Sequence, residues 1–271
     1  VLEDNKTLQD DINSLHIKAP EFFSFTTAEG VALNGYMIKP YNFDPNKKYP
    51  VIMRVYGGPG SQEAKQWYDG FKMMWHQMMA QKGYITVCVD NRGTALRGRD
   101  FRTSTYGQLG KYETNDQIEA AKWLSKQSFI DGNRIGIWGW SYGGYMAGLC
   151  ITRGADVFKA AVSVAPVTNW KYYDNIYTER YMGTLETNPN GFDANAPMAY
   201  ADKLQGKYLL IHGTGDDNVH FQNSAEWINA LIKNNKQFDE MIYPDRNHGV
   251  SGGNTRYHLY TLMTNFWLEN L

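Results

Sequence analysis

The chain has 271 residues, with 27 Lys and Arg against 28 Asp and Glu, and aromatic residues make up 14% of it. This length suits one large α/β domain with a deep core, and the balanced charge argues against nucleic acid or an anionic membrane surface as a partner. No apolar run reaches the roughly 20 residues of a membrane span, so we predict no membrane segment in this chain.

The first 20 residues are polar with sparse apolar spacing, which predicts a short helix or an arm. Residues 21–27 and 31–38 predict two β segments joined by a tight turn, a hairpin at the start of a sheet. We expect the α/β domain to extend over residues 21–271.

Apolar segments then alternate with helical ones. Strands are predicted over residues 49–56, 84–90, 134–138, 160–165, 207–212 and 238–243, and helices over 72–81, 114–126, 142–153, 221–234 and 257–271. This alternation is typical of a mostly parallel central sheet covered by helices on both faces. There is no Gly-rich phosphate loop after the first strand and no Cys/His cluster with metal spacing, so we expect no cofactor and no metal. Cys88 and Cys150 are interpreted as small buried hydrophobes.

The most informative motif is Gly-x-Ser-x-Gly at residues 139–143, between a predicted strand and a predicted helix. This order is typical of a nucleophile elbow, a sharp turn that exposes a serine hydroxyl at the carboxyl edge of a sheet. Gly139 and Gly143 have no Cβ, so the turn can fold tightly around Ser141. The five-residue pattern also occurs by chance in loops, and its place between strand and helix is what favours catalysis.

A serine nucleophile needs a base within hydrogen-bond reach and a carboxylate behind that base. With this elbow, the order along the chain is serine, acid, histidine. Three later histidines belong to predicted strands or helices: His212, His220 and His258. His248 instead lies in a loop after a late strand. We therefore predict His248 as the base, the alternative being a solvated loop histidine without a catalytic role.

The acid should lie between Ser141 and His248, in a loop at the carboxyl end of a strand. The loop 213–218 has this position and holds two neighbouring candidates, Asp216 and Asp217, which the residues themselves do not separate. The alternative is that both only cap the helix that follows.

The oxyanion of an acyl-transfer intermediate needs preorganised donors. The elbow places the backbone amide of Tyr142 for this purpose. The phenol of Tyr56, at the end of an earlier strand, can supply a second hydrogen bond. The alternative for Tyr56 is a strand-end tyrosine that packs on the core.

With these residues assembled, the chain resembles the catalytic domain of the dipeptidyl peptidase IV group, in the prolyl oligopeptidase family of serine peptidases. The resemblance runs from residue 49 to the end and is carried by long motifs at residues 55–62, 139–144, 165–167 with 170–174, 177–183 and 212–221. It implies an α/β-hydrolase fold. The roles that it implies are nucleophile for Ser141, acid for Asp216 rather than Asp217, base for His248, and oxyanion hole for Tyr56 and Tyr142.

The resemblance also implies a pocket for proline, walled by Val167, Trp170, Tyr173 and Tyr177, with Asn218 and Val219 beside it. The sequence agrees in part, because Trp170, Tyr173 and Tyr177 are spaced as on one face of a helix. A flat slot with aromatic walls suits a pyrrolidine ring, which has apolar faces and no amide hydrogen. The alternative is that these rings only pack the core.

Members of this group carry an upstream β-propeller domain, which holds the acidic residues that bind the free amino terminus of the substrate. We therefore expect residues 1–20 to be an N-terminal arm or the end of such a domain, and the chain to be the catalytic part of a longer protein. By resemblance alone we also expect a homodimer, in the periplasm or outside the cell.

The resulting hypothesis is a serine peptidase that releases N-terminal dipeptides after a penultimate proline or alanine, through an acyl-enzyme on Ser141. Its partner is a peptide with penultimate proline. One alternative is a prolyl tripeptidyl peptidase, an acylaminoacyl peptidase or an esterase on the same fold. Another is a catalytically silent hydrolase fold that acts as a binding module, against which an intact set of Ser141, Asp216 and His248 argues.

Overall fold

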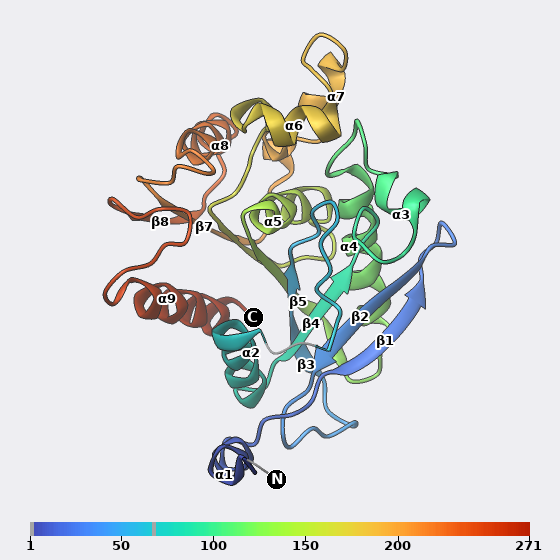
Figure 1. Ribbon diagram of the computed structural model, residues 1–271, viewed down its shortest axis with the longest axis vertical. Helices are drawn as coiled ribbons and strands as arrows, with labels where there is room; N and C mark the ends of the chain where they lie inside the picture. The colour runs from blue at the N-terminus through green and yellow to red at the C-terminus, as the bar shows by residue number, and fades with distance from the viewer. Residues whose placement is uncertain (1–2, 67–68) are drawn as a thin grey trace.

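The computed structural model describes residues 3–66 and 69–271. Among these residues a sheet of eight strands runs through the centre in the order β1-β2-β4-β3-β5-β6-β7-β8 (Figure 1). The strands are β1 (Glu21–Thr26), β2 (Ala32–Ile38), β3 (Tyr49–Val55), β4 (Ile85–Asp90), β5 (Ile130–Trp140), β6 (Ala160–Val164), β7 (Lys207–Gly213) and β8 (Asp239–Tyr243).

The prediction of a mostly parallel sheet is confirmed. Only the pairs β1–β2 and β2–β4 are antiparallel among the described strands, and the predicted hairpin is the first of them. The other neighbours, from β4 across to β8, pair in parallel. Strands β3, β4 and β6 are buried at every residue, which explains why their sequences are apolar without alternation.

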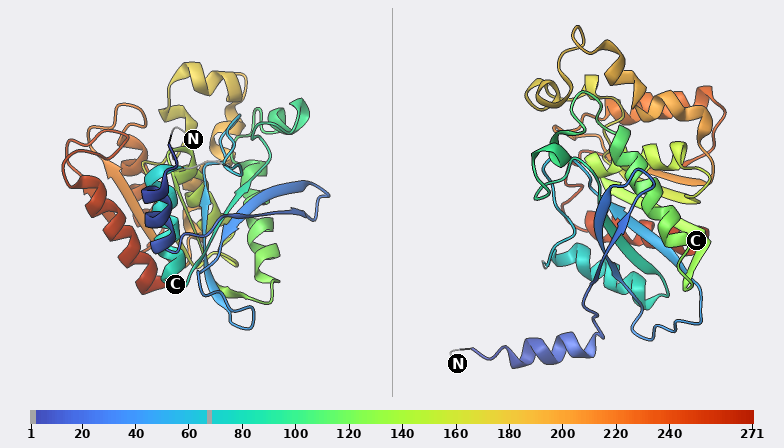
Figure 2. Two further views of the ribbon diagram at one scale, coloured as in Figure 1. Left: turned by 60° about the horizontal axis from the view of Figure 1, so that its bottom comes forward. Right: turned by 90° about the vertical axis from the view of Figure 1, so that its right-hand side faces the viewer.

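Helices cover both faces of the sheet, as predicted (Figures 1 and 2). The α-helices are α1 (Lys6–Ser14), α2 (Gly70–Gln81), α3 (Arg99–Thr103), α4 (Lys111–Ser125), α5 (Tyr142–Arg153), α6 (Asn175–Met182), α7 (Pro189–Ala194), α8 (Gln222–Lys233) and α9 (Thr255–Asn270). Two 3₁₀ helices are η1 (Trp170–Tyr172) and η2 (Pro197–Lys203). Helices α2 and α9 share one core with the sheet, around Trp75, Trp138 and Trp267. Helices α4, α5 and α8 share the other, which contains Tyr145 and Trp227.

The two ends of the molecule are formed by α1 on one side and by α6 and α7 on the other (Figures 1 and 2). Helix α1 projects away from the body, and none of its residues is buried, as its polar sequence requires (Figure 2). Helices α6 and α7 lie on the opposite side, above the carboxyl ends of the central strands (Figure 1). No helix in the described part of the chain has the length and apolar character needed to cross a membrane.

The turn after β4 ties the loop after β3 to helix α4. Nδ2 of Asn91 donates to the carbonyl oxygen of Gly57 (3.0 Å), and its Oδ1 accepts from Nε2 of Gln117 (3.0 Å). Beside it, Arg92 forms a two-pronged ion pair with the buried Asp116, with N···O distances of 2.6 and 3.0 Å. These contacts hold the loop that begins at the end of β3.

Replacing Asp116 with Ala should lower the free energy of unfolding by about 1–3 kcal/mol, because the Arg92 guanidinium would lose its two-pronged partner and keep the ion pair with Glu29. Urea unfolding followed by tryptophan fluorescence measures the change. Asp131→Ala is the control, since the pair of Asp131 with Arg134 is more exposed and should contribute less than about 1 kcal/mol. Equal unfolding midpoints for Asp116→Ala and the wild type would contradict the importance of the buried pair.

Candidate active site

Ser141 lies in the turn between β5 and α5, in the middle of the sheet. Its backbone has φ 61° and ψ −120°, a strained conformation for a residue other than glycine. Hydrogen bonds hold it on both sides: its amide donates to the carbonyl oxygen of Val164 (2.8 Å), and its own carbonyl accepts from the amide of Tyr145 (3.0 Å). This geometry is that of a nucleophile elbow.

Two glycines permit the elbow. A Cβ on Gly143 would lie 2.2 Å from the carbonyl oxygen of Val55, and a Cβ on Gly139 would lie 2.5 Å from the same oxygen. Both distances are far below van der Waals contact, so neither position can hold a side chain without moving β3 or α5. The close approach predicted from these glycines is therefore present.

Asp216 and His248 form a hydrogen-bonded pair beside the elbow, with 2.8 Å between Nδ1 of the histidine and Oδ2 of the aspartate. Trp140, the last residue of β5, donates from Nε1 to the carbonyl oxygen of His248 (2.9 Å), so the histidine loop is tied to the elbow. No hydrogen bond joins the Ser141 hydroxyl to His248 among the described residues. In free enzymes this contact often forms only when substrate binds.

The carboxylate of Asp216 is held at both oxygens. Its Oδ1 accepts from the backbone amides of Asn218 (3.0 Å) and Val219 (2.9 Å), and its Oδ2 lies within reach of His212 as well as His248. Burial opposes the ionisation of Asp216, but the hydrogen bonds from the two histidines outweigh it and hold the pKa of this carboxyl well below its ordinary value. Asp216 is therefore an anion at neutral pH.

The structure separates the two candidate acids. Asp217 is exposed, and within the described residues its side chain forms no hydrogen bond or ion pair. Neither aspartate caps α8, whose first residues have no side-chain cap. The capping alternative is thus excluded, and Asp216 is the aspartate that the fold brings to His248.

The two predicted oxyanion donors lie next to the elbow. The amide of Tyr142 is the first of α5, where no intrahelical acceptor exists. The ring of Tyr56 lies 6.0 Å from that of Tyr142, and its Cα lies close to Gly143. Burial and then the neighbouring Tyr173 raise the pKa of the Tyr56 phenol above its usual value. The phenol therefore keeps its proton and can donate.

The side chain of Tyr142 connects the elbow to α4. Its phenol donates to Oε1 of the buried Glu113 (2.7 Å). Burial raises the pKa of Glu113 to about 7. The sequence analysis missed Glu113, because an acidic residue in the first turn of a helix is usually a solvated one that favours the helix dipole.

The residues predicted to line a pocket do gather. Trp170 stacks on Tyr177 with 5.6 Å between ring centroids, and Tyr173 meets both rings edge-on. Val167 and Val219 are buried in the same core. The hydroxyl of Tyr173 lies 3.0 Å from Oδ1 of Asn218 and donates to it, which fixes the orientation of that amide.

The predicted reason for this cluster is wrong, however. Trp170 belongs to η1, Tyr173 follows it with an extended backbone, and Tyr177 lies in α6, so the three do not share the face of one helix. The chain turns at Asp174, whose carboxylate caps α6 by accepting from the amide of Tyr177 (2.8 Å). This turn, rather than helical periodicity, brings the rings together.

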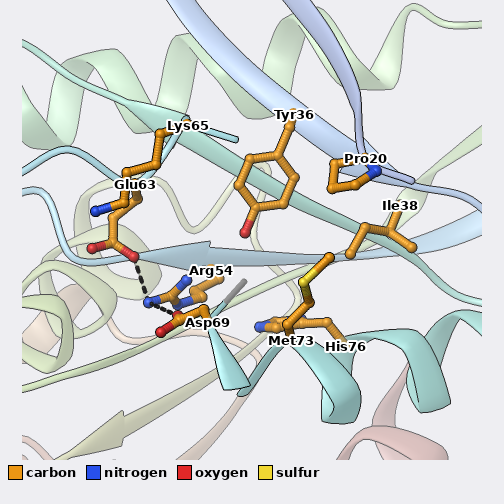
Figure 3. A pocket seen from close by; sticks show the side chains of 9 residues that line it. All are labelled: Pro20, Tyr36, Ile38, Arg54, Glu63, Lys65, Asp69, Met73 and His76. Atoms are coloured by element: carbon orange, nitrogen blue, oxygen red, sulfur yellow. Dashed lines mark ion pairs between the residues drawn. The ribbon is translucent and has the colours of Figure 1, made fainter. Parts of the chain in front are cut away.

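A separate small cavity lies between the sheet and α2 (Figure 3). Its charged lining is self-paired, because Arg54 forms ion pairs with Glu63 and with Asp69. Its volume is about 60 Å³, which admits water but no peptide. It contains none of the predicted site residues and no serine, so it is not the candidate active site. Elsewhere too, the described residues hold no cluster of three or more His, Cys, Asp or Glu that could bind a metal.

Comparisons with known proteins extend over the whole chain. The model of the prolyl oligopeptidase family matches residues 70–271. Prolyl endopeptidase FAP of Mus musculus is 43% identical over 98% of this chain, and dipeptidyl peptidase 4 of Bos taurus is 40% identical over 98%. The crystal structure of Porphyromonas gingivalis dipeptidyl peptidase 4 is 44% identical, covers 100% of this chain and matches it with a TM-score of 0.95. The chain spans 35% of the length of these curated relatives and 38% of the solved chain.

Replacing Gly143 with Ala should disrupt the elbow, because the new methyl group would meet the carbonyl oxygen of Val55. We expect a loss of stability of about 1–3 kcal/mol and little labelling of Ser141 by a fluorophosphonate probe. Gly148→Ala in the same helix is the control: its Cβ would meet Pro197 at an ordinary 3.5 Å, and alanine favours a helix. If both variants label and unfold like the wild type, the close approach is not needed.

The buried Glu113 predicts a pH-dependent stability. Between about pH 4.5 and 7 the folded state keeps the Glu113 proton, while the unfolded state has lost it. The free energy of unfolding of the wild type should therefore fall by about 2–3 kcal/mol relative to that of Glu113→Gln as pH rises through this window. Above the window the difference should stay constant. Denaturant unfolding at several pH values measures it, with Gln at the exposed Glu240 as control. Parallel curves for the wild type and Glu113→Gln would show that Glu113 ionises normally.

Proposed function

The chain belongs to the prolyl oligopeptidase family, and on that premise we propose that it is a serine peptidase that releases N-terminal dipeptides after a penultimate proline or alanine. The observation that carries the proposal is the Asp216–His248 pair, which Trp140 ties to the strained Ser141. The names of the relatives support it, since one is a dipeptidyl peptidase and another a prolyl endopeptidase.

In the proposed reaction, Oγ of Ser141 attacks the carbonyl carbon of the penultimate residue, while Nε2 of His248 takes the hydroxyl proton. Asp216 accepts the Nδ1 hydrogen and stabilises the imidazolium that forms. The Tyr142 amide and the Tyr56 phenol donate to the oxyanion of the tetrahedral intermediate. His248 then passes its proton to the leaving amine, which departs as the C–N bond breaks.

The resulting acyl-enzyme is an ester of Ser141. Water attacks its carbonyl carbon and gives up a proton to His248. The second intermediate then collapses as its bond to Oγ breaks, His248 returns the proton to Oγ, and the dipeptide leaves the regenerated serine. Since Asp216 stays ionised throughout, its part is to orient the imidazole and balance its charge.

The ring cluster supports the proposal of proline as the residue next to the cleaved bond. The rings of Trp170, Tyr173 and Tyr177 present aromatic faces and edges to one another, and the buried Val167 and Val219 belong to the same apolar core. A pyrrolidine ring or a methyl group can pack against such a cluster without leaving a donor unpaired, because proline has no amide hydrogen.

A prolyl endopeptidase is a second candidate, because the 43% identical relative from Mus musculus carries that name. The serine, its partners and the pocket would be used in the same way, and only the requirement for a free substrate amine differs. The same comparison of substrates also tests the acylaminoacyl peptidase, esterase and silent-module alternatives.

The decisive test is chromophore release from Gly-Pro-p-nitroanilide, from its N-acetylated form and from a p-nitrophenyl ester, each with Ser141→Ala as control. We expect Ser141-dependent release from both prolyl substrates. A preference of about tenfold or more for the free amine, the effect of one charge-assisted hydrogen bond, would show that this chain itself recognises the substrate amine.

Equal release from both prolyl substrates would mean a working triad and proline site without recognition of the substrate amine, and preference for the acetylated one would indicate an acylaminoacyl peptidase. Release from the ester alone would leave an esterase. If no release depends on Ser141, the chain is a silent binding module and the proposal fails.

A further inference from the structure

His212 is a second histidine in contact with Asp216, and the proposed reaction gives it no part. It lies near the end of β7 and is 0% exposed. Its Nε2 lies 3.1 Å from Oδ2 of Asp216, the same oxygen that Nδ1 of His248 approaches to 2.8 Å. One carboxylate oxygen is therefore shared by two imidazole rings.

The contacts determine which nitrogen of His212 carries the proton. Nε2 faces two acceptors, Oδ2 of Asp216 and the carbonyl oxygen of Val219 (2.9 Å), so the hydrogen must be on Nε2. On the other side of the ring, Nδ1 lies 2.6 Å from Oγ of Ser224 and accepts its hydroxyl hydrogen. Neutral His212 thus satisfies every polar contact of a fully buried ring, without the cost of burying another charge.

This hydrogen bond determines where Oδ2 of Asp216 points. The other oxygen, Oδ1, is held by two backbone amides, while in the described part of the chain the side chains of His212 and His248 are what contact Oδ2. His248 lies in an exposed loop with a quarter of its side chain accessible, whereas His212 belongs to β7, which pairs with a strand on each side. The rigid partner of the carboxylate is therefore His212.

We propose that His212 is a positioning residue of the peptidase: its Nε2–H directs Oδ2 of Asp216 toward His248 and takes up part of the negative charge on that oxygen. The inference rests on the proposed function and adds a residue to it. Ser224 is the partner that satisfies Nδ1, the ring nitrogen of His212 that faces away from Asp216.

The proposal predicts the direction in which the pH profile shifts when His212 is lost. An oxygen that already accepts one N–H stabilises the His248 imidazolium less than a free one does. Loss of the His212 donor should therefore make His248 easier to protonate and move the acid limb of the kcat/KM profile to higher pH. A carboxylate with more rotational freedom should at the same time lower kcat, because the imidazole is less well oriented.

Other charged or titratable groups near the pair stay in place when His212 is changed. From α9, Arg256 donates to the carbonyl oxygen of Gly249 (3.1 Å), the residue that follows His248 in the chain. From the loop after β8, Arg246 is bonded to Thr255 (2.9 Å). The Tyr173 phenol has a pKa raised by burial first and then by carboxylates that include Asp216. A shift of the acid limb in a His212 variant therefore reports on the contact with Asp216.

Four variants test the proposal in the 271-residue chain. His212→Gln keeps an N–H donor near the position of Nε2, and His212→Leu removes the donor at similar size. Ser224→Ala keeps the imidazole but removes the hydrogen-bond partner of its Nδ1, which holds the ring in place. His76→Leu is the matched control, since His76 is also buried but lies in α2, where neither ring nitrogen has a hydrogen-bond partner among the described residues. For each we measure kcat and KM against pH on the prolyl anilide, with circular dichroism as a check of folding.

We expect His212→Leu to lower kcat by about 10- to 100-fold, the effect of losing one hydrogen bond to a charged group, with little change in KM and an acid limb moved to higher pH. His212→Gln should restore most of kcat, Ser224→Ala should show a smaller shift in the same direction, and His76→Leu should keep the wild-type profile. An unchanged profile in a folded His212→Leu, or the same change in His76→Leu, would overturn the proposal.

If His212→Leu does not fold, His212→Phe takes its place, because it keeps a flat ring without the N–H donor. A wild-type pH profile in a folded His212→Phe would reduce His212 to a structural residue. Failure of the proposed function is separate, because it would appear as a wild type without turnover. In that case the pH dependence of Ser141 labelling by a fluorophosphonate probe takes the place of turnover in all variants. The same shift in labelling would support the role of His212, and its absence would refute it.

Discussion

The site depends on the strained backbone of Ser141. A residue other than glycine held in such a conformation costs about 1–3 kcal/mol, so the surroundings must enforce it. They do so because β5 lies between β3 and β6 in the sheet and because every residue of α5 except Arg153 is buried. The turn cannot relax without separating a central strand from a buried helix. That enforced turn determines the position of the serine hydroxyl and leaves the amide of Tyr142 without an acceptor inside the helix.

Much of this arrangement could be predicted because it rests on local patterns. Buried parallel strands are apolar throughout, and the spacing of glycines around Ser141 indicates a turn that no side chain could enter. Chain order leaves four histidines after Ser141, and the loop position of His248 then selects it as the predicted base. Order alone could not separate Asp216 from Asp217. The loop turns the carboxylate of Asp216 inward, where it accepts hydrogen bonds from the amides of Asn218 and Val219, and the sequence does not reveal this turn.

What escaped prediction depends on contacts between distant segments. The pocket rings come together through a turn at Asp174, a conformation that residue spacing does not reveal. His212 was placed correctly within a strand, but its contact with Asp216 arises from the fold of the loop after β7. Glu113 lies 29 residues from Tyr142 in the chain, and only the packing of α4 against α5 shows that it is buried. In each case the local sequence had a more ordinary explanation.

Tyr142 shows why these parts cannot vary independently. Its amide is the first of α5, its ring packs 5.3 Å from that of Trp170, and its phenol is bonded to Glu113. In the proposed reaction this amide is an oxyanion donor and Trp170 contacts the substrate. On that proposal a change in the ring cluster that moves Tyr142 also moves an oxyanion donor, which would couple substrate selection to catalysis through one residue. The buried phenol, whose pKa burial raises well above its usual value, stays neutral, so this coupling operates through packing and hydrogen bonds rather than through charge on Tyr142.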